Sequence, residues 1–127
     1  MLRATIFDMD GLLLDSEKLW HEAEVEILGQ LGVPINRDGT RLTKGMFVAE
    51  VVHFWNERHP WSGPSESDVV EQVLTRVGEL VEGSGEMMPG ALRAIELAGE
   101  RGPVVIGSST PRPLIERCLR HFGLLDY

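Results

Sequence analysis

The feature that most constrains this 127-residue chain is a short apolar run, Ala4 to Phe7, that ends at two acidic residues one position apart. The run is typical of a buried β-strand, and Gly11 allows the chain to turn sharply after it. Side chains at i and i+2 point the same way on an extended backbone, so Asp8 and Asp10 are expected to converge on one small space. Two carboxylates that close favour a cation or a proton between them, which suits metal binding and acid–base chemistry.

Length and composition are those of one ordinary globular domain, with 43% hydrophobic and 25% charged residues. The net charge of −8 and a pI near 4.9 argue against nucleic acid as a partner, because non-specific binding to phosphates depends on Lys and Arg. No apolar run is long enough to span a membrane, and the N-terminus lacks the pattern of a signal peptide. We therefore expect a cytoplasmic protein without a membrane partner.

The single cysteine, Cys118, lies in a stretch with helical spacing, Leu114 to Phe122, and is expected to face the core. One cysteine cannot form an internal disulfide, and no second thiol could complete a zinc site with it. The four histidines show no metal-ligand spacing, so each is interpreted as structural or solvated: His21, His53, His59 and His121.

Hydrophobic periodicity predicts a mostly helical middle and a second strand near the C-terminus. Ser16 is expected to cap the first helix, Ser65 or Ser67 the third, and Pro89 to open the fourth. The four helices are predicted over residues 16–31, 45–58, 65–83 and 89–100, and the strand over 104–107 without alternation, as in a sheet covered on both faces. This order predicts an α/β fold whose partial core, residues 1–14 and 86–127, is interrupted by a helical cap, residues 15–85.

Hydroxyl side chains follow the second strand directly, at Ser108, Ser109 and Thr110, and a further helix opens at Pro111. Hydroxyls at a strand end, beside the unpaired N–H groups of a helix start, make a potential anion site. Taken alone, these residues are better explained as helix caps. The remote pair of acids makes a phosphate site the favoured interpretation.

The segment Phe7 to Glu17, Phe-Asp-Met-Asp-Gly-Leu-Leu-Leu-Asp-Ser-Glu, resembles the first signature of the haloacid dehalogenase (HAD) superfamily, in the branch of β-phosphoglucomutase and the sugar-phosphate phosphatases. The strand that ends at Ser108 resembles the second signature. The resemblance implies a HAD-like Rossmannoid core with an inserted cap. It also implies a phosphate site at Ser108, at the backbone N–H of Ser109 and at Gly11.

The same resemblance implies a mechanism. Asp8 would attack the phosphorus of a phosphate monoester to form an aspartyl-phosphate, and Asp10 would act first as acid and then as base. Mg²⁺ would be held by Asp8 and Asp10, the latter through its backbone carbonyl, and would offset charge at the phosphate. Magnesium is preferred over zinc because the ligands are hard oxygens.

Residues 51–55 and 58–65 of the cap, and residues 86–90 directly after it, resemble the hexitol- and 2-deoxyglucose-6-phosphate phosphatases of this branch. Trp20 stands where the phosphomutases carry a histidine, which favours a phosphatase over a mutase. Phe47 stands where these phosphatases usually have an arginine, and Lys44 is a candidate for a substitute cation. Trp55 is interpreted as a core residue rather than part of a sugar site, for which Trp61 is a second candidate.

The chain ends at Tyr127, where members of the superfamily continue with strands that carry a lysine and further acidic metal ligands. We therefore expect only the N-terminal part of the core: a truncated, weakly active phosphatase of a small sugar phosphate. The alternatives are a β-phosphoglucomutase-like phosphomutase and a non-catalytic fragment. With two strands only, the apolar side chains of the sheet would lack neighbours, and self-association is one way to cover them.

Overall fold

The computed structural model describes residues 3–127 of the chain. It divides into two compact units, one of Met1–Glu17 with Val81–Tyr127 and one of Lys18–Leu80. The finer boundaries of core and cap expected from the sequence, 14/15 and 85/86, stay a prediction. Within the described range, no helix combines the length and the apolar character needed to cross a membrane.

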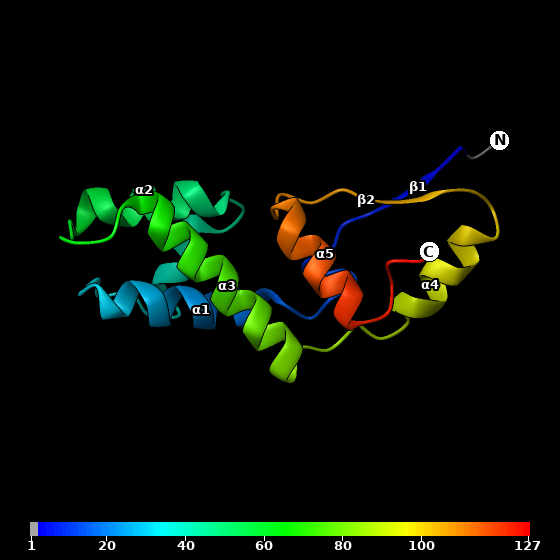
Figure 1. The fold of residues 1–127 in the computed structure, drawn as a ribbon, viewed down its shortest axis with the longest axis horizontal. Helices are drawn as coiled ribbons and strands as arrows, with labels where there is room; N and C mark the ends of the chain where they lie inside the picture. The colour runs from blue at the N-terminus through cyan, green and yellow to red at the C-terminus, as the bar shows by residue number, and fades with distance from the viewer. Residues whose placement is uncertain (1–2) are drawn as a thin grey trace. The chain divides into compact units, whose positions relative to one another are not determined.

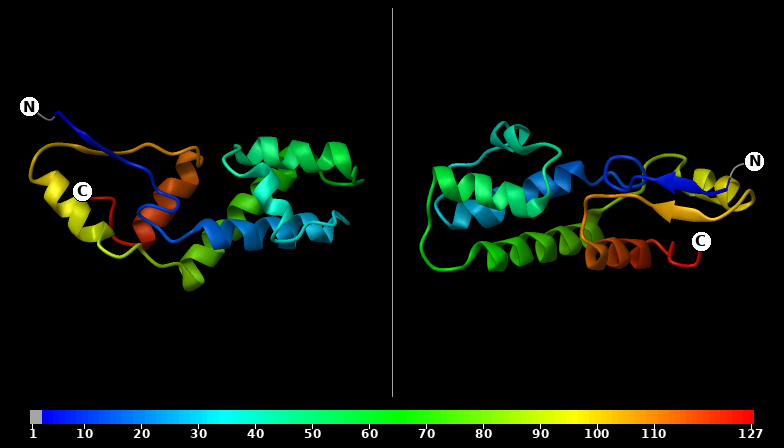
Figure 2. Two further views of the ribbon diagram at one scale, coloured as in Figure 1. Left: turned by 180° about the vertical axis from the view of Figure 1, so that it is seen from behind. Right: turned by 90° about the horizontal axis from the view of Figure 1, so that it is seen from above.

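The first unit holds both strands, β1 (Thr5–Phe7) and β2 (Val104–Ile106), and the helices α4 (Ala91–Gly99) and α5 (Arg112–His121). The strands pair in parallel, with Phe7 opposite Ile106. The right-hand view of Figure 2 shows the strands side by side, and Figure 1 shows α4 and α5 on the same side of them. The order of strand, insertion, helix, strand and helix is the α/β arrangement expected from the sequence.

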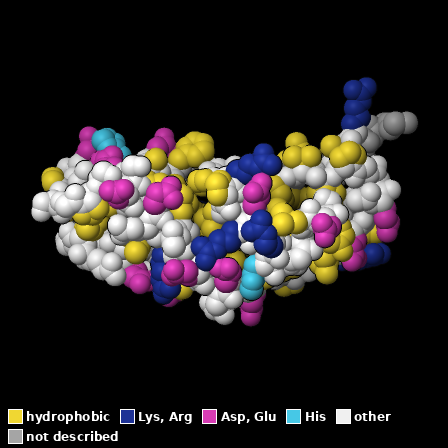
Figure 3. All heavy atoms as spheres, viewed as in Figure 1, with side chains coloured by type: hydrophobic (Ala, Val, Ile, Leu, Met, Phe, Trp, Pro, Cys, Tyr) yellow, Lys and Arg dark blue, Asp and Glu magenta, His cyan; other side chains and the backbone are white. Residues whose placement is uncertain are grey.

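The expectation of a sheet covered on both faces is wrong, whereas the expectation that apolar side chains of a two-stranded sheet lack neighbours is confirmed for Ile6 and Val105. Ile6 and its register partner Val105 are 71% and 47% exposed, while the residues on either side of them in each strand are half-buried. Alternate residues of a strand face opposite sides of the sheet, and the two helices cover only one side. Figure 3 shows hydrophobic side chains on the face of this unit along which the strands run.

The second unit is helical. It contains α1 (Glu17–Gln30) from Lys18 onward, a 3₁₀ helix (Gly39–Thr43), α2 (Val48–Arg58) and α3 (Glu66–Ser84) as far as Leu80. Its core is formed by apolar faces of the helices, and Trp55 of α2 is 5% exposed, which confirms its interpretation as a core residue. The buried members that α1 and α3 contribute lie at the predicted helical spacing: Leu19, Ala23, Ile27, Leu28, Val69, Val73, Val77 and Leu80.

The helices α3 and α4 begin in different ways. The Oγ of Ser65 accepts the N–H of Asp68 at 3.1 Å while the Asp68 carboxylate accepts the N–H of Ser65 at 3.4 Å, so Ser65 rather than Ser67 caps α3. The prediction for α4 is wrong in detail, because the helix begins at Ala91 and Pro89 lies outside it. Gly90, with φ of 80°, makes the turn into that helix, which only glycine adopts without strain.

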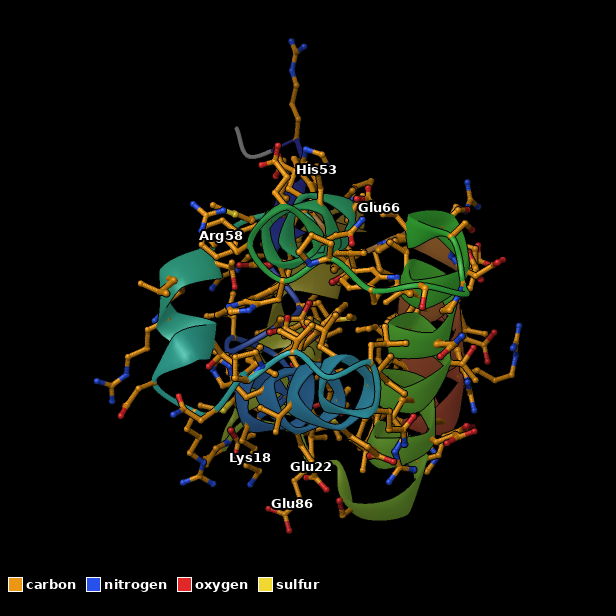
Figure 4. The ribbon with its side chains drawn as sticks, turned by 90° about the vertical axis from the view of Figure 1, so that its left-hand side faces the viewer. Lys18, Glu22, His53, Arg58, Glu66 and Glu86 are labelled. Carbon is orange, nitrogen blue, oxygen red and sulfur yellow. The ribbon has the colours of Figure 1, made fainter. Side chains whose placement is uncertain are left out.

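Polar and charged side chains of α2 and α3 are in contact on the surface of the second unit. Figure 4 shows His53 of α2 beside Glu66 at the start of α3, with 3.2 Å between His53 Nδ1 and the Glu66 carboxylate. Asn56 donates to the same carboxylate at 2.8 Å. The hydrogen bonds from Asn56 and His53 hold the pKa of Glu66 below its ordinary value.

Candidate functional site

The two sequence motifs leave the sheet at the same end. The pairing of Phe7 with Ile106 is extended by a hydrogen bond of 2.8 Å from the N–H of Gly107 to the carbonyl of Phe7. Asp8 and Ser108 are the next residues along each chain segment. In parallel sheets, the residues that follow the carboxyl ends of neighbouring strands are the usual place for a ligand site.

The segment after β1 is held by its backbone. The carbonyl of Met9 accepts hydrogen bonds from the N–H groups of Leu13 and Leu14, both at 3.0 Å, and the Met9 side chain is 1% exposed. Gly11 has φ of 78°, and its N–H donates to the carbonyl of Leu14 at 2.8 Å. This N–H therefore already has an acceptor within the loop, and a phosphate contact of Gly11 stays a prediction.

Asp8 and Asp10 lie in different surroundings. Asp8 is exposed, and its Oδ1 accepts the N–H of Met9 at 2.8 Å. Asp10 is half-buried, and each of its carboxylate oxygens accepts a hydroxyl: Oδ1 that of Ser16 and Oδ2 that of Thr110, both at 2.6 Å. The Asp10 carboxylate is thus held on both sides, whereas the exposed Asp8 faces solvent.

Thr110 links the two motifs, which are 100 residues apart in the chain. Its N–H donates to Ser108 Oγ at 3.1 Å, and its hydroxyl donates to Asp10. The sequence predicted a phosphate site at Ser108 and Ser109 without Thr110, and a capping role for Ser16. This prediction missed the contacts of both hydroxyls with Asp10, because nothing in the spacing of Ser16 or Thr110 indicates which acid they reach.

The start of α5 offers fewer donors to an anion than its position suggests. Pro111 and Pro113 have no N–H, and the N–H groups of Leu114 and Ile115 donate to the carbonyl of Pro111 at 3.0 and 3.1 Å. An anion at this edge would depend more on the strand-end hydroxyls than on the helix.

Cys118 of α5 is 2% exposed, which confirms that it faces the core. Burial, and secondarily the negative charge of Asp10, raise the pKa of its thiol to about 11. The thiol is protonated at neutral pH and is not a nucleophile there.

Among residues 3–127, no group of three or more histidine, cysteine or carboxylate side chains could hold a metal ion. The donors at the end of β1 nevertheless suit magnesium in kind. Mg²⁺ prefers hard oxygen ligands and is commonly bound through one or two carboxylates together with water and substrate phosphate. Asp8 offers such a carboxylate, while both carboxylate oxygens of Asp10 accept hydroxyls, which leaves its backbone carbonyl as the second candidate ligand.

The cap residues singled out from the sequence lie in the second unit. Phe47 is 57% exposed and Lys44 is also exposed, while the indole N–H of Trp61 donates to the carbonyl of Pro64 at 3.0 Å. A hollow of about 550 Å³ lies over the outer face of α2 between Met46 and Arg58 and includes neither Trp55 nor Trp61. A sugar site at Trp61 stays a prediction.

A family model for haloacid dehalogenase-like hydrolases matches residues 2–127. The chain belongs to this family. The HAD-like hydrolase fold and the resemblance read from Phe7 to Glu17 are thereby confirmed.

Known proteins similar to this HAD-like chain are longer than it is. Hexitol phosphatase B of Escherichia coli K12 is 43% identical over 125 residues, which are 97% of this chain and 56% of that protein. CbbY from Rhodobacter sphaeroides, solved in complex with phosphate, is 28% identical with a TM-score of 0.76 and is matched over 97% of this chain and 58% of its own. A candidate β-phosphoglucomutase from Thermotoga maritima is 27% identical with a TM-score of 0.73, over 99% and 58%. The chain spans little more than half the length of these relatives.

Proposed function

We propose that this chain belongs to a Mg²⁺-dependent phosphatase that hydrolyses a small sugar-phosphate monoester. The observation that carries the proposal is the hydrogen-bonded path from Ser108 through Thr110 to Asp10, which joins the ends of both strands. The identity to hexitol phosphatase B favours a phosphorylated hexitol or a related sugar as substrate. Trp20, in place of the mutase histidine, favours hydrolysis over phosphoryl transfer between sugar positions.

In the proposed reaction, the Asp8 carboxylate attacks phosphorus and the bond from phosphorus to the sugar oxygen breaks. Asp10, in its protonated form, gives its proton to the departing oxygen. A water molecule then attacks the aspartyl-phosphate, Asp10 takes a proton from it, and inorganic phosphate and free Asp8 result. Ser108 and the backbone N–H of Ser109 are proposed to bind the phosphate oxygens.

The exposure of Asp8 and the restraint of Asp10 fit this division of roles. A nucleophile must reach the substrate, and Asp8 is exposed. An acid–base group must be held within hydrogen-bond reach of the oxygen that it protonates, and Asp10 accepts two hydroxyls. Mg²⁺, held by Asp8 and by the carbonyl of Asp10, would offset the charge between nucleophile and phosphate.

The test is release of inorganic phosphate from a panel of hexitol and hexose phosphates, with and without Mg²⁺, by the chain and by Asp8→Asn. We expect release that requires both Mg²⁺ and Asp8, because an amide cannot form the aspartyl-phosphate. Conversion of a hexose 1-phosphate to its 6-phosphate without release would instead indicate a phosphomutase. Equal inactivity of both proteins would support the non-catalytic alternative.

A further inference from the structure

Two buried hydroxyls, from separate parts of the first unit, donate hydrogen bonds to the Asp10 carboxylate. Ser16, 2% exposed, donates to Oδ1, and Thr110, 7% exposed, donates to Oδ2, each at 2.6 Å. We infer that Ser16 and Thr110 are positioning residues that fix the Asp10 carboxylate for proton transfer. This inference deepens the proposed function and rests on it.

The geometry of these two hydrogen bonds favours a fixed orientation of the Asp10 carboxylate. Hydrogen bonds from hydroxyls to carboxylates are strong when they are as short as 2.5 to 2.7 Å, and here one lies on each oxygen. Two such contacts oppose rotation of the carboxylate about its bond to Cβ, a rotation that is otherwise broad for aspartate. Burial of both donors excludes water that would compete for the same oxygens.

Each of the two hydroxyls comes from a residue beside a helix or strand of the first unit. Ser16 lies directly before α1. Thr110 lies between β2 and α5, and its N–H is bound by Ser108 Oγ at 3.1 Å. The Asp10 carboxylate is therefore coupled through Thr110 to the residue proposed to bind phosphate, so that the proton donor and the phosphate ligand keep a fixed relation.

Proton donation by Asp10 matters most when the leaving oxygen is a poor leaving group. A sugar alkoxide needs the proton as the bond to phosphorus breaks, whereas p-nitrophenolate departs without one. The ratio of kcat/KM for sorbitol 6-phosphate to kcat/KM for p-nitrophenyl phosphate therefore reports how well Asp10 is placed. A change that only loosens the fold would lower both values together.

The experiment measures this ratio for the chain, Thr110→Val, Thr110→Ser, Ser16→Ala and Ser16→Thr. We expect Thr110→Val and Ser16→Ala each to lower the ratio by about tenfold, a part of the 10²- to 10⁴-fold that positioned acid–base groups contribute. Thr110→Ser and Ser16→Thr keep a hydroxyl and should restore the ratio. Thr40→Val is the matched control, since Thr40 is 2% exposed in the other unit and donates to the carbonyl of Arg37 at 2.7 Å.

A second measurement does not depend on activity. With aspartate labelled at ¹³Cγ, the Asp10 resonance should move in Thr110→Val and in Ser16→Ala at constant pH, while that of Asp8 serves as internal reference. An unchanged Asp10 resonance, or an unchanged ratio in a chain that hydrolyses both esters, would overturn the inference. If the unaltered chain hydrolyses neither ester with Mg²⁺, the proposed function fails and the catalytic role of the two hydroxyls fails with it.

Discussion

Glu24 lies on the buried face of α1 and is 8% exposed. Burial raises the pKa of its carboxyl from the ordinary value of 4.5 to about 7. Between these values the unfolded chain has already lost the proton that the folded chain retains, so the folded state is stabilised less as pH rises. We predict that ionisation of Glu24 contributes a fall of up to about 3 kcal/mol in the free energy of unfolding as the pH rises from 4.5 to 7.

The variant Glu24→Gln isolates this contribution, because glutamine has a similar shape and no charge to desolvate. Urea unfolding across that pH range should show a flatter dependence for Glu24→Gln than for the unaltered chain. Glu22→Gln is the control on the same helix, since Glu22 is exposed and lies at the surface in Figure 4. Equal slopes for Glu24→Gln and the unaltered chain would contradict the prediction.

At the scale of one element, Gly83 in the last turn of α3 and Gly85 directly after the helix differ in their tolerance for a side chain. A Cβ on Gly83 would meet nothing within 4 Å, whereas a Cβ on Gly85 would lie 2.5 Å from the carbonyl oxygen of Val81. Gly83→Ala should stabilise the chain by about 0.5–1 kcal/mol, because alanine favours the helix. Gly85→Ala should destabilise it, because the backbone must shift.

Chemical denaturation of Gly83→Ala and Gly85→Ala under one set of conditions tests this pair. Each protein serves as the matched control of the other, since both gain the same methyl group two positions apart. Two changes of the same sign would show that the end of α3 is looser than its contacts suggest.

Elements with long periodic patterns could be predicted from the sequence, and short ones less well. The spacing of apolar residues located α1 and α3, and it assigned Trp55 and Cys118 to the core. A continuous apolar run of three or four residues cannot show how many faces of a sheet are covered, which is why β1 and β2 were expected to be buried.

Some features of the candidate site could also be predicted from the sequence, while others could not. The acids after β1 and the hydroxyls after β2 could be found because each follows an apolar run directly. The contact of Thr110 with Asp10 could not be predicted, since a hydrogen bond across 100 residues depends on tertiary structure. Pro111 and Pro113 do indicate from the sequence that the start of α5 has few donors for an anion, because proline has no N–H.

At the scale of the whole molecule, the exposed apolar face of the sheet is where we expect self-association. Ile6 and Val105 lie opposite each other in the register and are 71% and 47% exposed. We predict that the double variant Ile6→Thr and Val105→Thr binds less of a hydrophobic dye and self-associates less, as measured by sedimentation. Its stability should change by less than about 1 kcal/mol, because threonine suits a strand and little buried area is lost.

The control for this double variant is Leu97→Thr, since Leu97 is 37% exposed on α4 of the same unit. It removes a comparable exposed side chain away from the strands. If Leu97→Thr lowers dye binding and self-association as much as the double variant does, the sheet face has no special role. A compact monomer without dye binding for the unaltered chain would also contradict the prediction.

The parallel pairing of Thr5 with Val104 has a consequence for the order of folding. Closing a flexible loop of about 100 residues costs on the order of 4 kcal/mol in chain entropy. Lys18–Leu80 is a continuous segment with its own contacts and can become ordered before that loop closes. During synthesis β1 is made about 100 residues before β2, so the Asp10 carboxylate can meet the Thr110 hydroxyl only after the second motif has been added.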